Sequence, residues 1–322
     1  MRQVPAAGAC GKAASVKRPP VIIGARGSML SVAQTNAVIR ALRRAHPGRR
    51  FELRTITTLG DRAAKWSRSD TGIFVKEIED ELCAGRIDIA VHSVKDLPSR
   101  LPPGLALAAV TKRRDPRDVL ITRSGGGLFS LRKGSCIGTS SLRRRAQILH
   151  LRPDMRIMEL RGNLDTRIRK LRSGSYDAIV VAAAGLCRLC VRNTGARPLA
   201  VEIMLPQAGQ GALGIEVRAD DRFARQLVRP LDDPGSHACI DAERSFLRKT
   251  DAGCRMPVAA FAQISQARMA LEGMVISLDG TRMIRLSASS SVRDAEALGK
   301  RLARQVLQYG GAQILKEIRD GG

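Results

Sequence analysis

The sequence predicts an α/β protein with a smaller α+β domain at its C-terminal end. Between Val21 and about residue 182, short apolar segments alternate with helical ones, which is typical of a parallel sheet with helices on both faces. Beyond about residue 222, two helical stretches precede three strand-like segments and a long helix, a pattern that indicates an antiparallel sheet. The length of 322 residues exceeds what one hydrophobic core usually supports, so we expect two or three domains.

The first group of elements follows a basic N-terminal segment. Residues 1–19 contain no acidic residue and no apolar core of a secretory signal, and we expect a disordered extension there. The expected strands are 21–25, 51–58 and 87–92, chosen for their apolar runs or their alternation. The expected helices are 29–45 and 74–84, and the polar residues 60–72 are expected to form a loop.

Two further groups of elements follow. The second group has expected strands at 136–139, 157–160, 178–182 and 212–217, with helices at 140–151 and 164–172. The third group has expected helices at 222–231, 236–249 and 292–309, and strands at 258–264, 269–278 and 281–288.

The chain carries a large excess of positive charge. Lys and Arg number 55 against 30 Asp and Glu, a formal net charge of +25. Such an excess suits a polyanion: nucleic acid, an anionic membrane, or a substrate with many carboxylates or phosphates. It also fits a solvated surface, because the arginines are scattered along the whole chain. Aromatic residues make up only 3%, which argues against a base-stacking platform, and no apolar run reaches the roughly 18 residues of a membrane span.

The seven cysteines show no spacing typical of a disulfide framework. We therefore expect free thiols and a reducing compartment, the cytoplasm. Cys187 and Cys190 form one C-x-x-C pair, but a structural zinc site needs a second pair or nearby histidines. We expect no metal site.

The first motif that could carry chemistry is the apolar strand that leads into Lys95 and Asp96. In open α/β sheets the carboxyl ends of strands face the ligand crevice, so Asp96 is placed where a functional acid would be. A surface salt bridge or a helix cap is the alternative for the same pair. His92, inside the strand, is expected to be a packed residue rather than a catalyst.

Two further strand ends carry serine and arginine. After the strand at 136–139, Ser140 or Ser141 can cap the next helix, whose first turn holds Arg143 and Arg144. Arginines there oppose the helix dipole, so an anion bound at the helix start would give them a reason. Arg161 and Arg167 follow the next strand, and Arg26 and Ser28 follow the first one. Several guanidinium groups at strand ends suggest a ligand with several carboxylates, because the planar fork binds carboxylate with two hydrogen bonds.

A loop cysteine completes the set of candidates. Cys254 lies between Gly253 and Pro257, just before an expected strand and close to Arg255. An exposed thiol near basic residues is a candidate nucleophile or attachment point. An idle cysteine is the alternative that the spacing alone leaves open.

Together these segments resemble the porphobilinogen deaminase (hydroxymethylbilane synthase) family, from about Val21 to the C-terminus. The matching segments occur in the family's order and are 25–28, 74–77, 92–98, 115–118, 138–144, 160–167, 184–189, 209–211 and 253–254. The resemblance implies an enzyme that joins four porphobilinogen molecules head to tail with release of ammonia, giving the linear hydroxymethylbilane of tetrapyrrole biosynthesis. It also implies a dipyrromethane cofactor, made from the substrate and held by a thioether.

The same resemblance implies a division into three domains. Residues 20–111 and 212–230 would form a discontinuous first α/β domain, and 112–211 a second. Both would resemble the lobes of type II periplasmic binding proteins. Residues 231–322 would form the α+β third domain, with a three-stranded antiparallel sheet and the cofactor-attachment loop.

The resemblance assigns roles residue by residue. Cys254 would carry the cofactor and Asp96 would be the catalytic acid. The residues that bind cofactor and substrate carboxylates would be Arg26, Ser28, Lys95, Ser140, Ser141, Arg143, Arg144, Arg161, Arg167 and Arg188. Phe74 and Gln210 would belong to the active-site loop or its packing. The expected partner is porphobilinogen alone, without nucleic acid or membrane, and the expected state is a monomer.

Two other classes of function remain as alternatives from the residues. A non-catalytic ligand-binding module of the periplasmic-binding-protein type would have the same fold, but it would leave Asp96 and Cys254 without a joint role. A nucleic-acid-binding protein is suggested only by the net charge, and the sequence shows no reading helix with interleaved aromatic residues.

Overall fold

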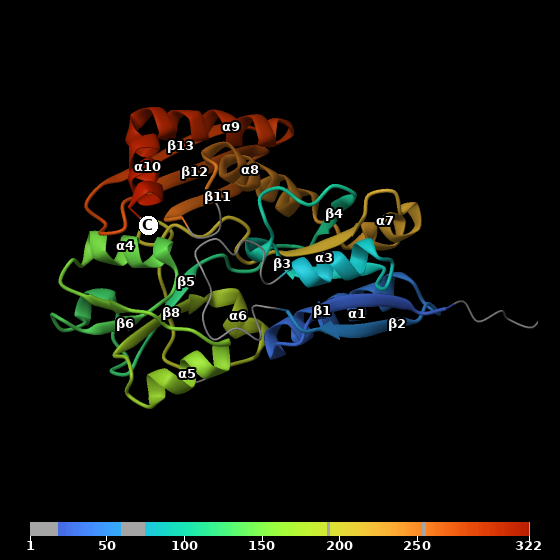
Figure 1. Ribbon diagram of the computed structural model, residues 1–322, viewed down its shortest axis with the longest axis horizontal. Helices are drawn as coiled ribbons and strands as arrows, with labels where there is room; N and C mark the ends of the chain where they lie inside the picture. The colour runs from blue at the N-terminus through green and yellow to red at the C-terminus, as the bar shows by residue number, and fades with distance from the viewer. Residues whose placement is uncertain (1–18, 59–74, 192–193, 253–255, 322) are drawn as a thin grey trace, which may run out of the picture.

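The computed structural model describes residues 19–58, 75–191, 194–252 and 256–321, and Figure 1 shows three sheets within them. Two sheets have five strands each and the third has three. The predicted fold class is confirmed: two α/β sheets are accompanied by a small antiparallel sheet with helices. None of the helices in these ranges is both long and apolar enough to cross a membrane.

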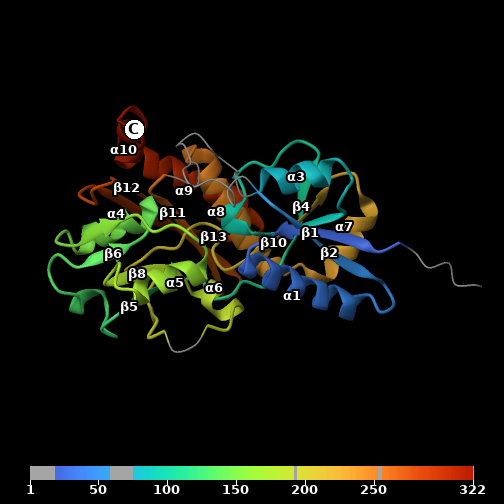
Figure 2. The ribbon, with the colours of Figure 1, turned by 60° about the horizontal axis from the view of Figure 1, so that its bottom comes forward.

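The first sheet has the strand order β2-β1-β3-β10-β4. Its strands are β1 (Val21–Arg26), β2 (Phe51–Ile56), β3 (Ile89–Ser93), β4 (Leu105–Val110) and β10 (Leu213–Arg218). The helices α1 (Met29–Ala45) and α7 (Arg222–Val228) share a core with one face of the sheet, and α3 (Lys76–Cys83) shares a core with the other. Figure 2 shows α1 and α3 on opposite sides of β1.

The second sheet repeats this plan with the order β7-β6-β8-β5-β9. Its strands are β5 (Asp118–Thr122), β6 (Cys136–Gly138), β7 (Arg156–Met158), β8 (Ala178–Ala182) and β9 (Arg197–Pro198). The helix α4 (Leu142–Leu151) packs on one face, and α5 (Leu164–Arg172) and α6 (Ala183–Arg188) pack on the other.

The two sheets share a further local detail at corresponding strands. Asp88 precedes β3 and its Oδ2 accepts a hydrogen bond from the backbone N–H of Ile22, at 2.8 Å. Asp177 precedes β8 and its Oδ2 accepts one from the N–H of Cys136, also at 2.8 Å. Each carboxylate therefore ties the start of one central strand to the start of its parallel neighbour.

Both large sheets are mixed, which corrects the expectation of parallel sheets. β10 runs antiparallel to β3 and β4, and β5 runs antiparallel to β8 and β9. The chain crosses between the sheets twice, through residues 111–117 after β4 and residues 199–212 after β9. The strand that follows each crossing, β5 or β10, runs opposite to its neighbours in the new sheet. It is the fourth strand in the order given above for that sheet.

The third sheet is antiparallel, in the order β11-β12-β13. Its strands are β11 (Val258–Ser265), β12 (Arg268–Ile276) and β13 (Met283–Ser291), and it packs against α8 (Pro234–Thr250) and α9 (Ala295–Val306). The helix expected at 292–309 ends at Val306. A π-type turn over Leu307–Gly311 follows, with Gly310 at a φ of 112°, and a helix that was not predicted, α10 (Ala312–Asp320), closes the chain.

One buried carboxylate joins the third sheet to both crossing segments. Glu243 of α8 is fully buried and forms an ion pair with Arg113 of the first crossing, with 2.5 Å between Oε1 and Nη1. Its Oε2 accepts a hydrogen bond from the N–H of Gly209 in the second crossing, and its Oε1 accepts one from the N–H of Ala262 in β11. The position of the third sheet is thus fixed relative to the segments that connect the other two.

Candidate active site

A cavity opens at the carboxyl ends of β1 and β3. Arg26, Ser28 and Asp96 line it, as expected for residues placed at the ends of these strands. Ser28 is the N-cap of α1 and its Oγ accepts a hydrogen bond from the N–H of Ser31, at 3.3 Å. His92 also lines the cavity, but it is buried and its Nε2 lies 3.1 Å from Oε2 of the buried Glu216, so it is a packed residue.

The second sheet ends its first parallel strand in the same way. β6 leads through Thr139 and Ser140 to Ser141, which is the N-cap of α4 and accepts a hydrogen bond from the N–H of Arg144. Ser140 instead donates its hydroxyl hydrogen to the carbonyl of Leu160, at 2.8 Å. Of the two serines that could cap this helix, Ser141 does so. Ser140 instead joins the end of β6 to the segment that follows β7.

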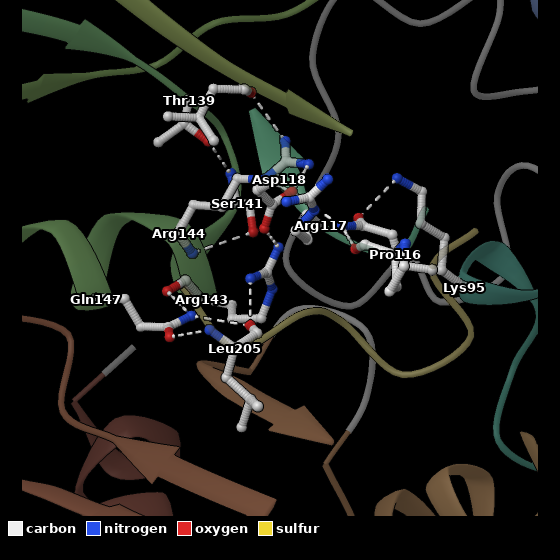
Figure 3. A network of polar contacts seen from close by, with 12 residues as sticks. Lys95, Pro116, Arg117, Asp118, Thr139, Ser141, Arg143, Arg144, Gln147 and Leu205 are labelled. Atoms are coloured by element: carbon white, nitrogen blue, oxygen red, sulfur yellow. Dashed lines mark hydrogen bonds and ion pairs between the residues drawn. The ribbon is translucent and has the colours of Figure 1, made fainter. Parts of the chain in front are cut away.

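The two arginines in the first turn of α4 meet an internal carboxylate. Asp118, the first residue of β5, accepts hydrogen bonds from Nη2 of Arg143 at 2.7 Å and from Nε and Nη2 of Arg144 at 3.0 and 2.7 Å (Figure 3). Arg143 and Arg144 are 3% and 6% exposed, and Asp118 is fully buried. A carboxylate of the protein itself therefore balances part of the charge of these two arginines.

Lys95 approaches the same cluster from the first sheet. Its Nζ donates to Oε1 of Gln210 at 3.3 Å, and Nε2 of Gln210 donates to Oδ1 of Asp118 at 3.0 Å. Burial lowers the pKa of Lys95 to about 8; the charges of Arg144 and Arg143 add to this, while Asp96 and Asp118 oppose it. Side chains of both sheets and of the second crossing thus meet in one network, which Figure 3 shows.

Arg167 belongs to the same electrostatic environment. Its Nε donates to the carbonyl of Gly162 at 2.8 Å, inside the turn that precedes α5. Burial lowers the pKa of Arg167 to about 10, the charge of Arg144 lowers it further, and Asp96 opposes this. Asp96 therefore acts electrostatically on cations from both sheets, Lys95 of the first and Arg167 of the second.

Arg161 and Arg188 lie in different surroundings. Arg161 forms an ion pair with Glu159 at 2.7 Å, and its side chain is 39% exposed. Arg188, at the end of α6, donates through Nη2 to the carbonyl of Gly211 in the second crossing, at 2.8 Å. Burial lowers the pKa of Arg188 to about 10, and the neighbouring Arg114 adds to the effect. Arg188 thus faces the crossing segments, whereas Arg161 is held beside Glu159 near the surface.

Two residues of the predicted site, Cys254 and Phe74, lie outside the described residues. The chain on either side of residues 253–255 is anchored in the third core: Ala252 is 2% exposed and Met256 packs against the same cluster. Asp251 ends α8 in the left-handed conformation, with a φ of 49°.

Gly209 brings the second crossing close to the segment that carries Lys95. Its φ is +77°, and a Cβ there would lie 2.9 Å from the backbone N of Lys95 and 2.6 Å from Cγ1 of Val94. Only glycine adopts this conformation at low cost, and only glycine leaves room for the neighbouring backbone.

We expect Gly209→Ala to displace Lys95 and Asp96 and to reduce turnover by about 10²-fold, the usual cost of a misplacement of roughly 1 Å at a reacting centre. Gly104→Ala is the matched control, because its φ is +84° but no atom lies within 4 Å of the added Cβ. Steady-state kinetics and thermal unfolding of both variants check this. Equal losses of turnover in the two variants would show that backbone strain, not contact with Lys95, is responsible.

The sequence did not reveal the fully buried acidic residues in and around the site. Asp118 was noted only as part of the segment 115–118, and Glu243 and Glu216 drew no attention. Each is fully buried and has a basic partner far away in the sequence. One feature of the sequence could have indicated a buried carboxylate, namely an acidic residue at the edge of an apolar run. Asp118 is such a residue, because it begins the five residues of β5.

Comparisons with known proteins agree with this architecture. The family model described as "Porphobilinogen deaminase, dipyromethane cofactor binding domain" matches residues 21–226, and the model of the porphobilinogen deaminase C-terminal domain matches residues 237–308. A porphobilinogen deaminase of Syntrophobacter fumaroxidans is 46% identical over 299 residues, covering 92% of this chain and 97% of the relative. One of Thermus thermophilus is 47% identical over 300 residues, covering 93% and 99%.

Among solved structures, similarity extends to substrate-binding proteins. The second substrate-binding domain of a putative amino acid ABC transporter from Streptococcus pneumoniae has a TM-score of 0.43 at 11% identity, covering 66% of this chain and 92% of that domain. The extracellular-binding protein ytmK of a probable amino-acid ABC transporter from Bacillus subtilis has a TM-score of 0.40 at 10% identity, covering 66% and 90%. The two family models and the curated relatives span nearly the whole length of the sequence, and the chain belongs to the porphobilinogen deaminase family.

Proposed function

We propose that this chain catalyses the stepwise head-to-tail condensation of four porphobilinogen molecules, with release of ammonia, and hydrolysis of the product to hydroxymethylbilane. Membership of the family supports the reaction. The observation that carries it is geometric: Asp96 lines a cavity together with Arg26 and Ser28, and its neighbour Lys95 is joined through Gln210 to Asp118 and so to the arginines of the second sheet.

The basic network suits the charge of the substrate. Each porphobilinogen carries an acetate and a propionate, so a growing chain accumulates negative charge. Guanidinium groups bind carboxylates with two parallel hydrogen bonds. We assign carboxylate binding to Arg26, Ser28 and Lys95 in the first sheet, to Arg167 in the second, and to Ser140, Ser141, Arg143, Arg144, Arg161 and Arg188 as further candidates.

The residues also fit the dipyrromethane group. Arg26 and Ser28 supply a guanidinium and a hydroxyl to the cavity that Asp96 also lines, which suits an anionic group. We propose that Cys254 holds the group by a thioether and that the arginines of α4 bind its carboxylates. When bound, the group supplies the pyrrole to which the first substrate unit is added.

Asp96 would then do the proton chemistry. Loss of ammonia from porphobilinogen requires a proton on the leaving amine and produces a cationic azafulvene. A carboxylate beside the pyrrole nitrogen stabilises that cation, and it can later accept the proton that the ring loses after carbon–carbon bond formation. Asp96 lines the cavity and ends the short helical turn Val94–Asp96, so its position is set by β3.

We also propose that the protein works as a monomer in the cytoplasm. The five cysteines that lie within the described ranges (Cys83, Cys136, Cys187, Cys190 and Cys239) are all free thiols, which suits a reducing compartment. A non-catalytic ligand-binding module is not favoured, because the match to an enzyme family covers both large sheets and the C-terminal domain.

Intact-mass measurement tests the proposal. The purified chain is expected to weigh more than its polypeptide by one dipyrromethane, and to gain successive porphobilinogen increments when substrate is added. Cys254→Ser is expected to show neither, whereas the matched control Cys187→Ser, at an exposed thiol, keeps both. A wild-type mass equal to that of the bare polypeptide, with no consumption of porphobilinogen, would refute the proposed function.

A further inference from the structure

We propose that Asp118 is a positioning residue for the reaction, which fixes Arg143 and Arg144 directly and Lys95 through the amide of Gln210. This inference rests on the proposed function, because it concerns the same site. Neither the reaction nor the family match assigns a role to this carboxylate, which accepts hydrogen bonds from Arg143, Arg144 and Gln210.

The first step of the argument is the cost of two adjacent buried guanidiniums. Arg143 and Arg144 are consecutive and almost inaccessible to solvent, so their charges repel in a medium of low polarity. Asp118 accepts hydrogen bonds from both and supplies the countercharge. Burial opposes its ionisation, but the charges and hydrogen bonds of the two arginines outweigh burial and hold the pKa of Asp118 far below the usual range. It is therefore an anion throughout the working pH range.

The second step concerns how the orientation of the two guanidiniums is fixed. Asp118 engages Nη2 of Arg143 and the Nε–Nη2 edge of Arg144. The Nη1 groups donate to the carbonyls of Leu205, at 2.6 Å, and Val180, at 3.0 Å. With these donors committed, the orientation of each planar group is fixed.

The third step is the amide of Gln210. A carboxylate only accepts hydrogen bonds, so Asp118 requires the amide nitrogen of Gln210, which also donates to the carbonyl of Pro116 at 2.7 Å. The amide oxygen must then face the opposite way, where it accepts a hydrogen bond from Nζ of Lys95. Asp118, in the second sheet, thereby sets the partner of Lys95, in the first sheet, across the second crossing (Figure 3).

The last step is electrostatic. The charged groups that act on Lys95 are Asp96, beside it in the chain, Asp118 of β5, and Arg143 and Arg144 of α4. The two carboxylates favour its protonated form, whereas burial and the two arginines disfavour it and bring its pKa to about 8. Removal of the negative charge at Asp118 lowers that pKa further. Lys95 is the cation next to Asp96 in the chain. Without the charge of Asp118, Lys95 would be deprotonated at a lower pH than in the wild type.

The test compares Asp118→Asn with Asp177→Asn in the holoenzyme. Asp177 is the matched control because it is an aspartate directly before a strand of the second sheet, and its carboxylate accepts a hydrogen bond from the backbone N–H of Cys136 instead of from an arginine. For Asp118→Asn we expect kcat/KM for porphobilinogen to fall by about 10- to 100-fold, the scale of a misplaced binding group. We also expect the basic limb of its pH–rate profile to move to lower pH. Asp118→Glu, which keeps the charge, is expected to return that limb towards the wild-type position.

Two outcomes would overturn the inference. The first is that both variants are active and that Asp118→Asn has the same pH–rate profile and the same KM as Asp177→Asn. The second covers the case in which Asp118→Asn does not fold, and it uses Gln210→Leu. This variant leaves Asp118 paired with both arginines but removes the amide that links Asp118 and the carbonyl of Pro116 to Lys95. That variant is expected to have a lower kcat, a basic limb of the pH–rate profile at lower pH, and a KM near that of the wild type. If kcat and the position of the basic limb equalled the wild-type values, the proposed link between Asp118 and Lys95 would be refuted. A wild-type enzyme that consumes no porphobilinogen would instead overturn the proposed function itself.

Discussion

Replacement of Asp96 by Asn is expected to lower the turnover of porphobilinogen by about 10²–10⁴-fold, the range typical of general acid–base groups. The amide has nearly the same shape, but it carries no negative charge and does not exchange a proton with the leaving amine. The variant is expected to keep the covalent dipyrromethane group, because the basic side chains that would hold it are unchanged.

Single-turnover kinetics together with intact-mass measurement separate the two parts of this prediction. Asp88→Asn is the matched control: Asp88 lies at the other end of β3 and holds the N–H of Ile22. It should change turnover little. If Asp96→Asn turned over at the wild-type rate, Asp96 would not be the group that moves the proton.

Loss of the charge at Glu243 is expected to have the largest effect on stability. Arg113 is 10% exposed, stacks on the ring of Phe261 with 5.0 Å between its Cζ and the ring centroid, and is paired with the fully buried Glu243. In Glu243→Gln the guanidinium stays buried without its countercharge. Breaking one partner of a buried ion pair typically costs about 3–5 kcal/mol of unfolding free energy.

Chemical and thermal unfolding of Glu243→Gln should therefore show a clear loss. Glu317→Gln serves as the control, because Glu317 pairs with Arg282 at the surface, where both side chains are about half exposed. Such exposed pairs contribute roughly 0–1 kcal/mol. Equal losses in the two variants would contradict the view that Glu243 joins the third sheet to the crossing segments.

Local patterns in the sequence predicted most of the elements well. The helix at 164–172 and the strand at 178–182 have the predicted bounds, and a serine caps α4 as expected. These features depend on side chains within one or two turns of each other, which the sequence displays directly. The strands β4 and β5 were not predicted, although Leu105–Val110 and Asp118–Thr122 are short apolar runs.

The direction of the strands could not be predicted from such patterns. β5 and β10 are antiparallel because the chain enters each sheet from the other one, a property of the whole path rather than of five or six residues. Similarly, the pairing of Arg143 and Arg144 with Asp118 could not be predicted, because Asp118 lies 25 and 26 positions earlier in the chain. Nothing between them signals the pairing.

The double passage of the chain has a consequence for how the molecule could be divided. β4 pairs with β10 and with no other strand of the described sheet, although more than 100 residues separate them. A truncated piece that stops before β10 would leave β4 without a neighbour and expose the bare edge of β3. The first sheet is therefore completed only when the chain has been synthesised through β10, after every strand of the second sheet.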